Sequence, residues 1–313
     1  MKVGAIVVAA VLFAAPANAA NSVVGGFAFS YLDPDKGGPT PGVSQFSIAE
    51  GNGLVSAGGN LGAGTANSIK SQTRPWVNKL EITSDTSQGF VYGSGTSVSA
   101  INQQVTGSGT TPVNVKYSIG IDGSFTPGPT INYLPPQVVP AQNLTYYFLA
   151  YKGTAYGISK QTDQYGDYLY FDSSVGHNTL SRAAGDAGFS ATLVSPFAAR
   201  AICFGAAAGC LASGSIDATL NLSFDVLPGE DYFIVTYLSS QTNGQALFFN
   251  TARLLSVQLD PGYGLISGDG GAMQIGADGI FRPAVPEPAT WAMLIGGFGL
   301  VGGVQRRWRL RPA

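Results

Sequence analysis

The chain offers few side chains for acid–base chemistry, and its only histidine is His177. A Ser–His–Asp hydrolase would have to use this residue as its base, and the sequence contains no Gly-x-Ser-x-Gly elbow to carry the nucleophile. His177 lies in the polar stretch Asp172–Asn178, which is typical of a loop. A single loop histidine is more often exposed than catalytic, so no catalytic triad is predicted.

Paired carboxylates are the second source of catalysis to consider, because glycoside hydrolysis uses two carboxyl groups beside the scissile bond. Before residue 285 the chain has three glutamates, Glu50, Glu81 and Glu230. Its aspartates could serve in principle, but no local arrangement of acids marks a pair. We therefore predict no enzyme activity and no catalytic residues, and keep a surface hydrolase as an alternative function.

Two cysteines, Cys203 and Cys210, enclose the short segment Phe204–Gly209. An even number of cysteines in an exported chain indicates a disulfide. Chain entropy assigns a loop of this length about 2.5 kcal/mol of stabilisation. A cysteine–histidine metal site would need two further ligands, and His177 is remote in sequence, so no metal site is predicted.

Acidic residues in predicted loops are candidate calcium ligands, because calcium accepts oxygen atoms from flexible loops. None of these loops follows the twelve-residue helix–loop–helix pattern. Aspartate is also frequent in turns for its side-chain hydrogen bonds, so calcium binding stays open and no cofactor is predicted. The residues concerned are Asp33, Asp35, Asp163, Asp167, Asp269 and Asp278.

Tyrosines are concentrated in one short span of the chain. On a sheet face or loop tip their rings could stack against sugars, which would make the domain a carbohydrate-binding module. Aromatic residues of strands also pack into cores or against cross-strand neighbours. The tyrosines are Tyr146, Tyr147, Tyr151, Tyr156, Tyr165, Tyr168 and Tyr170.

Charge excludes one class of partner. Only 11% of the residues are charged, and the chain contains 43 glycines. When Lys2 and the C-terminal arginines are set aside, the remaining domain is mildly acidic. Nucleic acid binding calls for a basic stripe, so nucleic acid is not predicted as a partner, and the neutral polar composition suits an extracellular protein.

Two segments show the strict alternation of strands with one buried face. In Val113–Ile121 the apolar residues alternate with polar residues and glycine, and Ile216–Phe224 repeats this pattern. Further strands are predicted within 22–31, 76–84, 144–151, 168–172, 231–238 and 245–258. The stretch Phe197–Ala208 is helix-like, or else a loop held by the disulfide.

Short strands separated by glycine and proline turns predict an all-β fold, an antiparallel β-sandwich or jelly-roll-like ectodomain over 20–268. The proline-rich stretch 135–140 is a candidate division between two halves. The glycine-rich segment 269–284 is predicted to be a flexible linker.

The N-terminus has the three parts of a secretory signal peptide over 1–19. Lys2 supplies the positive charge, Val3–Ala15 the apolar region, and Ala17 and Ala19 a small-x-small cleavage site. Cleavage is predicted after Ala19, with Ala20 as the alternative.

The C-terminal region 285–313 joins a stiff box, an apolar segment and a basic tail. Pro286, Glu287 and Pro288 form the box, and 289–304 is predicted to be a single transmembrane helix with Trp291 at one interface. The tail 305–313 includes Arg306 and Arg307, and its positive charge favours a cytoplasmic C-terminus with the main domain outside.

This order of parts resembles the PEP-CTERM sorting signal of exported Gram-negative bacterial proteins. The resemblance is carried by Val285–Leu294, the glycine-rich run Ile295–Gly303, and the pair Arg306 and Arg307. It implies that an exosortase, an integral membrane protease, recognises the Pro-Glu-Pro box and removes the anchor. It further implies release or transfer to the cell surface, often alongside exopolysaccharide production.

Together these features predict an exported, non-enzymatic surface or extracellular-matrix protein. It would be anchored transiently in the inner membrane, cut by an exosortase, and associated with exopolysaccharide or biofilm. A carbohydrate-binding β-sandwich module is the main alternative.

Overall fold

The computed structural model describes residues 21–31, 46–51, 55–60, 68–83, 90–128, 142–163, 166–174, 176–182, 196–206, 208–268, 273–275 and 280–283. Within these ranges the regular structure consists of strands, and no helix is present. Their sheet pairings are antiparallel throughout. The prediction of an antiparallel all-β fold is confirmed.

Sheet A has the strand order β12-β8-β14-β6-β1-β2, with β16 paired to β6. These strands are β12 (Ala198–Gly205), β8 (Asn143–Lys152), β14 (Asp231–Thr242), β6 (Phe90–Thr106), β1 (Asn21–Tyr31), β2 (Phe46–Gly51) and β16 (Gly264–Ser267).

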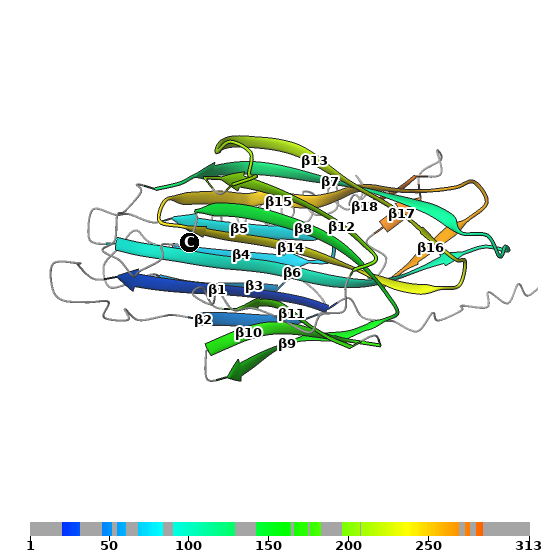
Figure 1. Cartoon of the computed structure of the whole chain (residues 1–313), viewed down its shortest axis with the longest axis horizontal. Coiled ribbons are helices and arrows are strands. Elements are labelled where there is room, and N and C mark those ends of the chain that lie inside the picture. The colour runs from blue at the N-terminus through cyan, green and yellow to red at the C-terminus, as the bar shows by residue number, and fades with distance from the viewer. Residues whose placement is uncertain are drawn as a thin grey trace, which may run out of the picture.

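Sheet B has the order β13-β7-β15-β5-β4-β3, with β18 paired to β15 and β17 to β18. Its strands are β13 (Gly214–Val226), β7 (Val113–Thr126), β15 (Gln245–Leu259), β5 (Val77–Thr83), β4 (Ser68–Arg74), β3 (Val55–Asn60), β18 (Phe281–Pro283) and β17 (Met273–Ile275). Sheet C is the meander β9 (Ala155–Asp163), β10 (Gly166–Ser173) and β11 (Gly176–Arg182), in the order β11-β10-β9. Figure 1 shows the strands of sheets A and B running along the long axis of the molecule, with sheet C at the lower edge of the view.

Sheets A and B share one hydrophobic core. Tyr117 of β7 in sheet B packs edge-on against Phe148 of β8 in sheet A, with ring centroids 5.6 Å apart. Its hydroxyl lies 2.8 Å from that of Tyr232 on β14, so the two buried phenols satisfy each other. The two sheets therefore form the faces of a sandwich.

The alternating sequence pattern decides which face of each strand enters this core. Along β7 the side chains of Val115, Tyr117 and Ile119 are fully buried, while Lys116 between them is exposed. Along β13, Ile216, Leu220 and Leu222 are buried in the same way. Both strands predicted from period-two alternation are present and extend beyond the predicted bounds.

The turn between β4 and β5 carries an unusual backbone conformation at Trp76, which has φ of 66°. A positive φ is uncommon for a residue with a side chain. The indole is 2% exposed and stacks on the Tyr117 ring with centroids 5.9 Å apart. Burial of this large ring offsets the backbone strain, because aromatic side chains contribute strongly to core energetics.

The proline-rich stretch 135–140 lies outside the described residues, but the strands on either side of it belong to the same sheets. The strand β7 before it pairs with β13 and β15 after it. The strand β6 likewise pairs with β14. The two parts of the chain thus alternate within one sandwich rather than forming separate halves.

Sheet C covers part of the outer face of sheet A. The apolar contacts there involve Val98, Ala100, Tyr151 and Ala155. At this corner the Asn102 side chain donates to the Ala155 carbonyl at 3.0 Å and accepts from the Ala155 amide at 2.8 Å. The amide group of Asn102 thereby replaces a strand partner where the chain leaves sheet A for sheet C.

Two interpretations need correction. The helix-like stretch Phe197–Ala208 forms β12, because β8 supplies a partner along Ala198–Gly205 and Phe204 is buried in the core. The linker predicted over 269–284 contains β17 and β18. Phe281 there is 9% exposed and pairs with Val257 of β15, so an apolar side chain docks this segment on sheet B.

Candidate functional site

The predicted sorting residues lie outside the residues that the structure describes. They are Pro286, Glu287, Pro288, Trp291, Arg306 and Arg307, and the same holds for the signal cleavage residues Ala17 and Ala19. Within the described ranges, no helix is long and apolar enough to span a bilayer. The nearest described element is β18, which ends at Pro283 and pairs with both β15 and β17. The last described residues before the Pro-Glu-Pro box are therefore fixed to sheet B.

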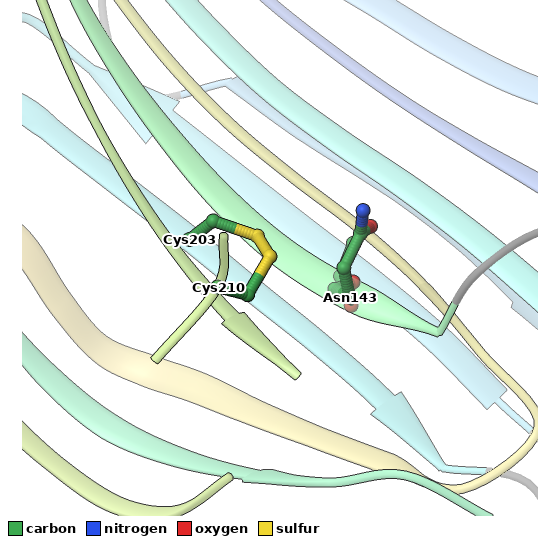
Figure 2. Close-up of a disulfide and its surroundings, with 4 residues drawn as sticks. Asn143, Cys203 and Cys210 are labelled. Atoms are coloured by element: carbon green, nitrogen blue, oxygen red, sulfur yellow. A yellow bond between two sulfur atoms is a disulfide. The ribbon is translucent and has the colours of Figure 1, made fainter. Parts of the chain in front are cut away.

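The cysteines form a disulfide that closes the end of β12. Cys203 and Cys210 are bonded, with their Cα atoms 4.6 Å apart. Figure 2 shows the bond beside the end of β8 that carries Asn143. The Gly205 amide donates to the Leu211 carbonyl at 2.9 Å, and the Leu211 amide donates to the Cys203 carbonyl at 2.7 Å. The loop thus provides hydrogen-bond partners for backbone groups on the edge of β12 that faces away from β8.

One pair of tyrosines forms an accessible aromatic surface on the outer face of sheet A. Tyr147 of β8 and Tyr237 of β14 are direct cross-strand partners, with ring centroids 5.6 Å apart and tilted by 47°. Tyr147 is 38% exposed and Tyr237 is half-buried. Partial burial and the neighbouring Tyr237 raise the pKa of Tyr147, while a hydrogen bond with Thr145 lowers it. We call Tyr147 and Tyr237 the tyrosine pair.

Two other members of the tyrosine cluster are buried, Tyr146 in the shared core and Tyr151 on the outer face of sheet A. Tyr146 is 1% exposed within the shared core, and burial raises its pKa. Tyr151 is 5% exposed and stacks on Phe233 at 5.1 Å, and burial raises its pKa to about 12. The side chains of Tyr156, Tyr165, Tyr168 and Tyr170 lie outside what the structure describes.

The two glutamates with described side chains are each held by a lysine. Glu81 of β5 accepts from Lys70 at 3.2 Å on sheet B. Glu230, before β14, accepts from Lys152 at 2.7 Å. The hydrogen bond from Lys152 lowers the pKa of Glu230, whereas a general acid needs a raised pKa. The structure does not bring Glu81 and Glu230 together as a catalytic pair.

The remaining candidate residues lie in sheet C or beyond it. His177 was expected in a loop but belongs to β11, where its backbone pairs with Asp172 of β10. Asp163 and Asp167 lie at the β9–β10 hairpin. Within the described part of the chain, no group of three histidine, cysteine or acidic residues is close enough to hold a metal ion. The acidic residues Asp33, Asp35, Asp269 and Asp278 fall outside that part.

Tyr237 was missed by the sequence reasoning. The segment 231–238 is apolar on both faces, which predicts a strand covered on both sides. The alternation of Phe233, Val235 and Tyr237 with Ile234 and Thr236 contained the information about which residues share the outer face. Exposure could not be read from that pattern, because it depends on which residues distant in sequence pack on the outer face of sheet A.

A comparison with protein-family models finds a match to the PEP-CTERM protein-sorting motif at residues 284–309. A search of curated proteins finds no match. The motif implies an exosortase as processing partner, with export and transient membrane anchoring before processing. The matched residues begin directly after β18. The resemblance drawn from the Pro-Glu-Pro box, the apolar run and the arginine pair is confirmed: this chain carries a PEP-CTERM protein-sorting motif after its β domain.

Proposed function

We propose that this protein is an exported, non-enzymatic surface or matrix protein whose β-sandwich is the delivered cargo. The observation that carries the proposal is the sorting motif at 284–309, placed directly after a strand that is docked on the domain. The basic tail favours a cytoplasmic C-terminus before processing. The lysine-paired glutamates support a role without acid–base catalysis.

Processing can be tested by mass spectrometry of the protein from its producing cells. We expect the mature chain to lack the apolar segment and Arg306. Glu287→Ala should leave the C-terminal segment uncleaved and the protein in the inner membrane. The control Glu230→Gln also removes a glutamate, but from the β domain, and should be processed normally. Wild-type protein that retains Ala313 in cells containing an exosortase would contradict the proposal.

A second candidate function is binding of the producer's exopolysaccharide at the tyrosine pair. Two neighbouring, partly exposed rings on a sheet face offer a stacking surface for sugar rings. Such a role would link the protein to biofilm.

Glycan-array binding tests this second function. The double change Tyr147→Ala and Tyr237→Ala should abolish binding, and Tyr151→Phe, which keeps a buried ring in place, should not. Glycan binding that survives the double change would remove this candidate while leaving the sorting proposal intact.

A further inference from the structure

Among the described strands, β13 forms a long open edge of the sandwich. It pairs with β7 in unbroken register from Gly214 to Val226, without a bulge. On its other side no described strand pairs with it. A strand of 13 residues at an edge presents a long row of backbone donors and acceptors.

The other edges are shorter or covered. The edge strands β2 and β3 have six residues each. The strand β12 has eight, and the disulfide loop folds back on it through Leu211, which bridges Phe204. Natural sheets protect their edges in this way or with proline, charged side chains and bulges. The strand β13 has no proline, lysine or bulge, and its charged side chains are two aspartates.

The exposed side chains of β13 are small, polar and held in place. Ser223 donates to Asn114 Oδ1 at 3.1 Å, and Asn114 donates to Asp225 at 2.7 Å. Asn221 accepts from Ser118 at 2.7 Å. Because hydrogen bonds already hold these side chains, less side-chain entropy is lost when another strand pairs with β13. The full exposed row is Ser215, Asp217, Thr219, Asn221, Ser223 and Asp225.

The row is complementary to itself in the antiparallel direction. In a register centred on Leu220, every residue of β13 has a partner in the second copy. Asp217 of one copy then lies opposite Ser223 of the other, and Ser215 lies opposite Asp225. No aspartate then faces another across the join. On the inner face Leu220 meets its own copy and Phe224 meets Ile216, which extends the core row. Leu220 and Phe224 are each 8% exposed at this edge, and the join would cover them.

We propose that β13 is a docking site for a second copy of this chain. The two β13 strands pair antiparallel about Leu220 and join both copies of sheet B into one continuous sheet. The interaction surface is the edge itself, and it goes beyond the proposed sorting function. For a surface protein, such pairing would supply cross-linking between neighbouring molecules.

Analytical ultracentrifugation of the full chain in detergent tests the proposal. The wild type should form dimers at concentrations up to about 100 μM. Ser223→Asp places two aspartate pairs across the join and should weaken dimerisation about tenfold or more. Combining Ser223→Asp with Asp217→Lys should restore it, because each aspartate then faces a lysine.

Two control variants isolate the edge. Ser223→Ala removes the hydrogen bond to Asn114 without adding charge, and Gln258→Glu adds the same charge on β15, away from the edge. Gln258→Glu should dimerise like the wild type, and Ser223→Ala should weaken dimerisation much less than Ser223→Asp because it adds no charge at the join. A wild type that stays monomeric, or a dimer that is insensitive to Ser223→Asp, would overturn the proposal. Either result would leave processing of the sorting motif unaffected.

Discussion

At the scale of residues, burial separates side chains of the same type into different roles. Tyr147 and Tyr151 lie on the same face of β8, but only Tyr147 remains accessible, because Tyr151 stacks on Phe233 within an apolar cluster that includes Ala155. Tyr146, the residue before Tyr147, faces the shared core. A cluster that looks uniform in sequence is therefore divided by the face of β8 on which each ring lies and by the side chains packed around it.

Buried phenols make the stability of the domain sensitive to alkaline pH. Burial raises the pKa of Tyr151 from 10.0 to about 12. The unfolded chain loses the proton first, so the contribution of Tyr151 is fully present below about pH 10 and is lost as pH rises to about 12. We expect the urea midpoint to fall across this window, and to fall less steeply in Tyr151→Phe. In a Tyr147→Phe control the urea midpoint should depend on pH more nearly as it does in the wild type. If the urea midpoint changes with pH identically in all three proteins, Tyr151 is not the source of the effect.

At the scale of elements, β12 depends on tertiary partners rather than on its own sequence. Its alanines favour helix in isolation, but pairing with β8 and burial of Phe204 hold it extended. The disulfide loop then covers its end.

Loss of the disulfide should weaken the end of β12. Replacing Cys203 and Cys210 by serine should lower the free energy of unfolding by about 2.5 kcal/mol, because the closed loop is short. Amide exchange should rise at Gly205 and Leu211, whose backbone bonds close the loop. Exchange within β7 should change only through the global loss of stability. Unchanged exchange at Gly205 would show that the loop holds its position without the bond.

At the scale of the whole molecule, the sandwich is built from strands far apart in sequence. The strand β7 has its partners in β13 and β15, more than 80 residues later. Trp76 reaches the same core through its stack on Tyr117. The chain on one side of 135–140 cannot complete either sheet by itself.

This interleaving predicts cooperative folding. The exported domain should unfold in urea as a single transition, with tryptophan fluorescence and circular dichroism giving the same midpoint. A fragment that ends near residue 140 should stay unfolded, because the apolar faces of β6 and β7 would lack β14, β13 and β15. Two separate transitions, or a folded fragment, would contradict a shared core.

Much of this protein could be read from local patterns. Period-two alternation in Val113–Ile121 and Ile216–Phe224 determined that these segments are strands and which face is buried, because the strand repeat is a local property of the backbone. The Pro-Glu-Pro box and the residues after it determined the sorting motif for the same reason, since such a motif is recognised as a linear sequence.

Other features were decided only by tertiary structure, because pairing and burial depend on residues distant in sequence. The extended conformation of Phe197–Ala208 required β8, and the docking of Phe281 within the predicted linker required an apolar position on β15. The exposure of Tyr147, in contrast to the burial of Tyr146 and Tyr151, depended on the packing around sheet A. The open edge at β13 followed from strand order, which no local pattern encodes.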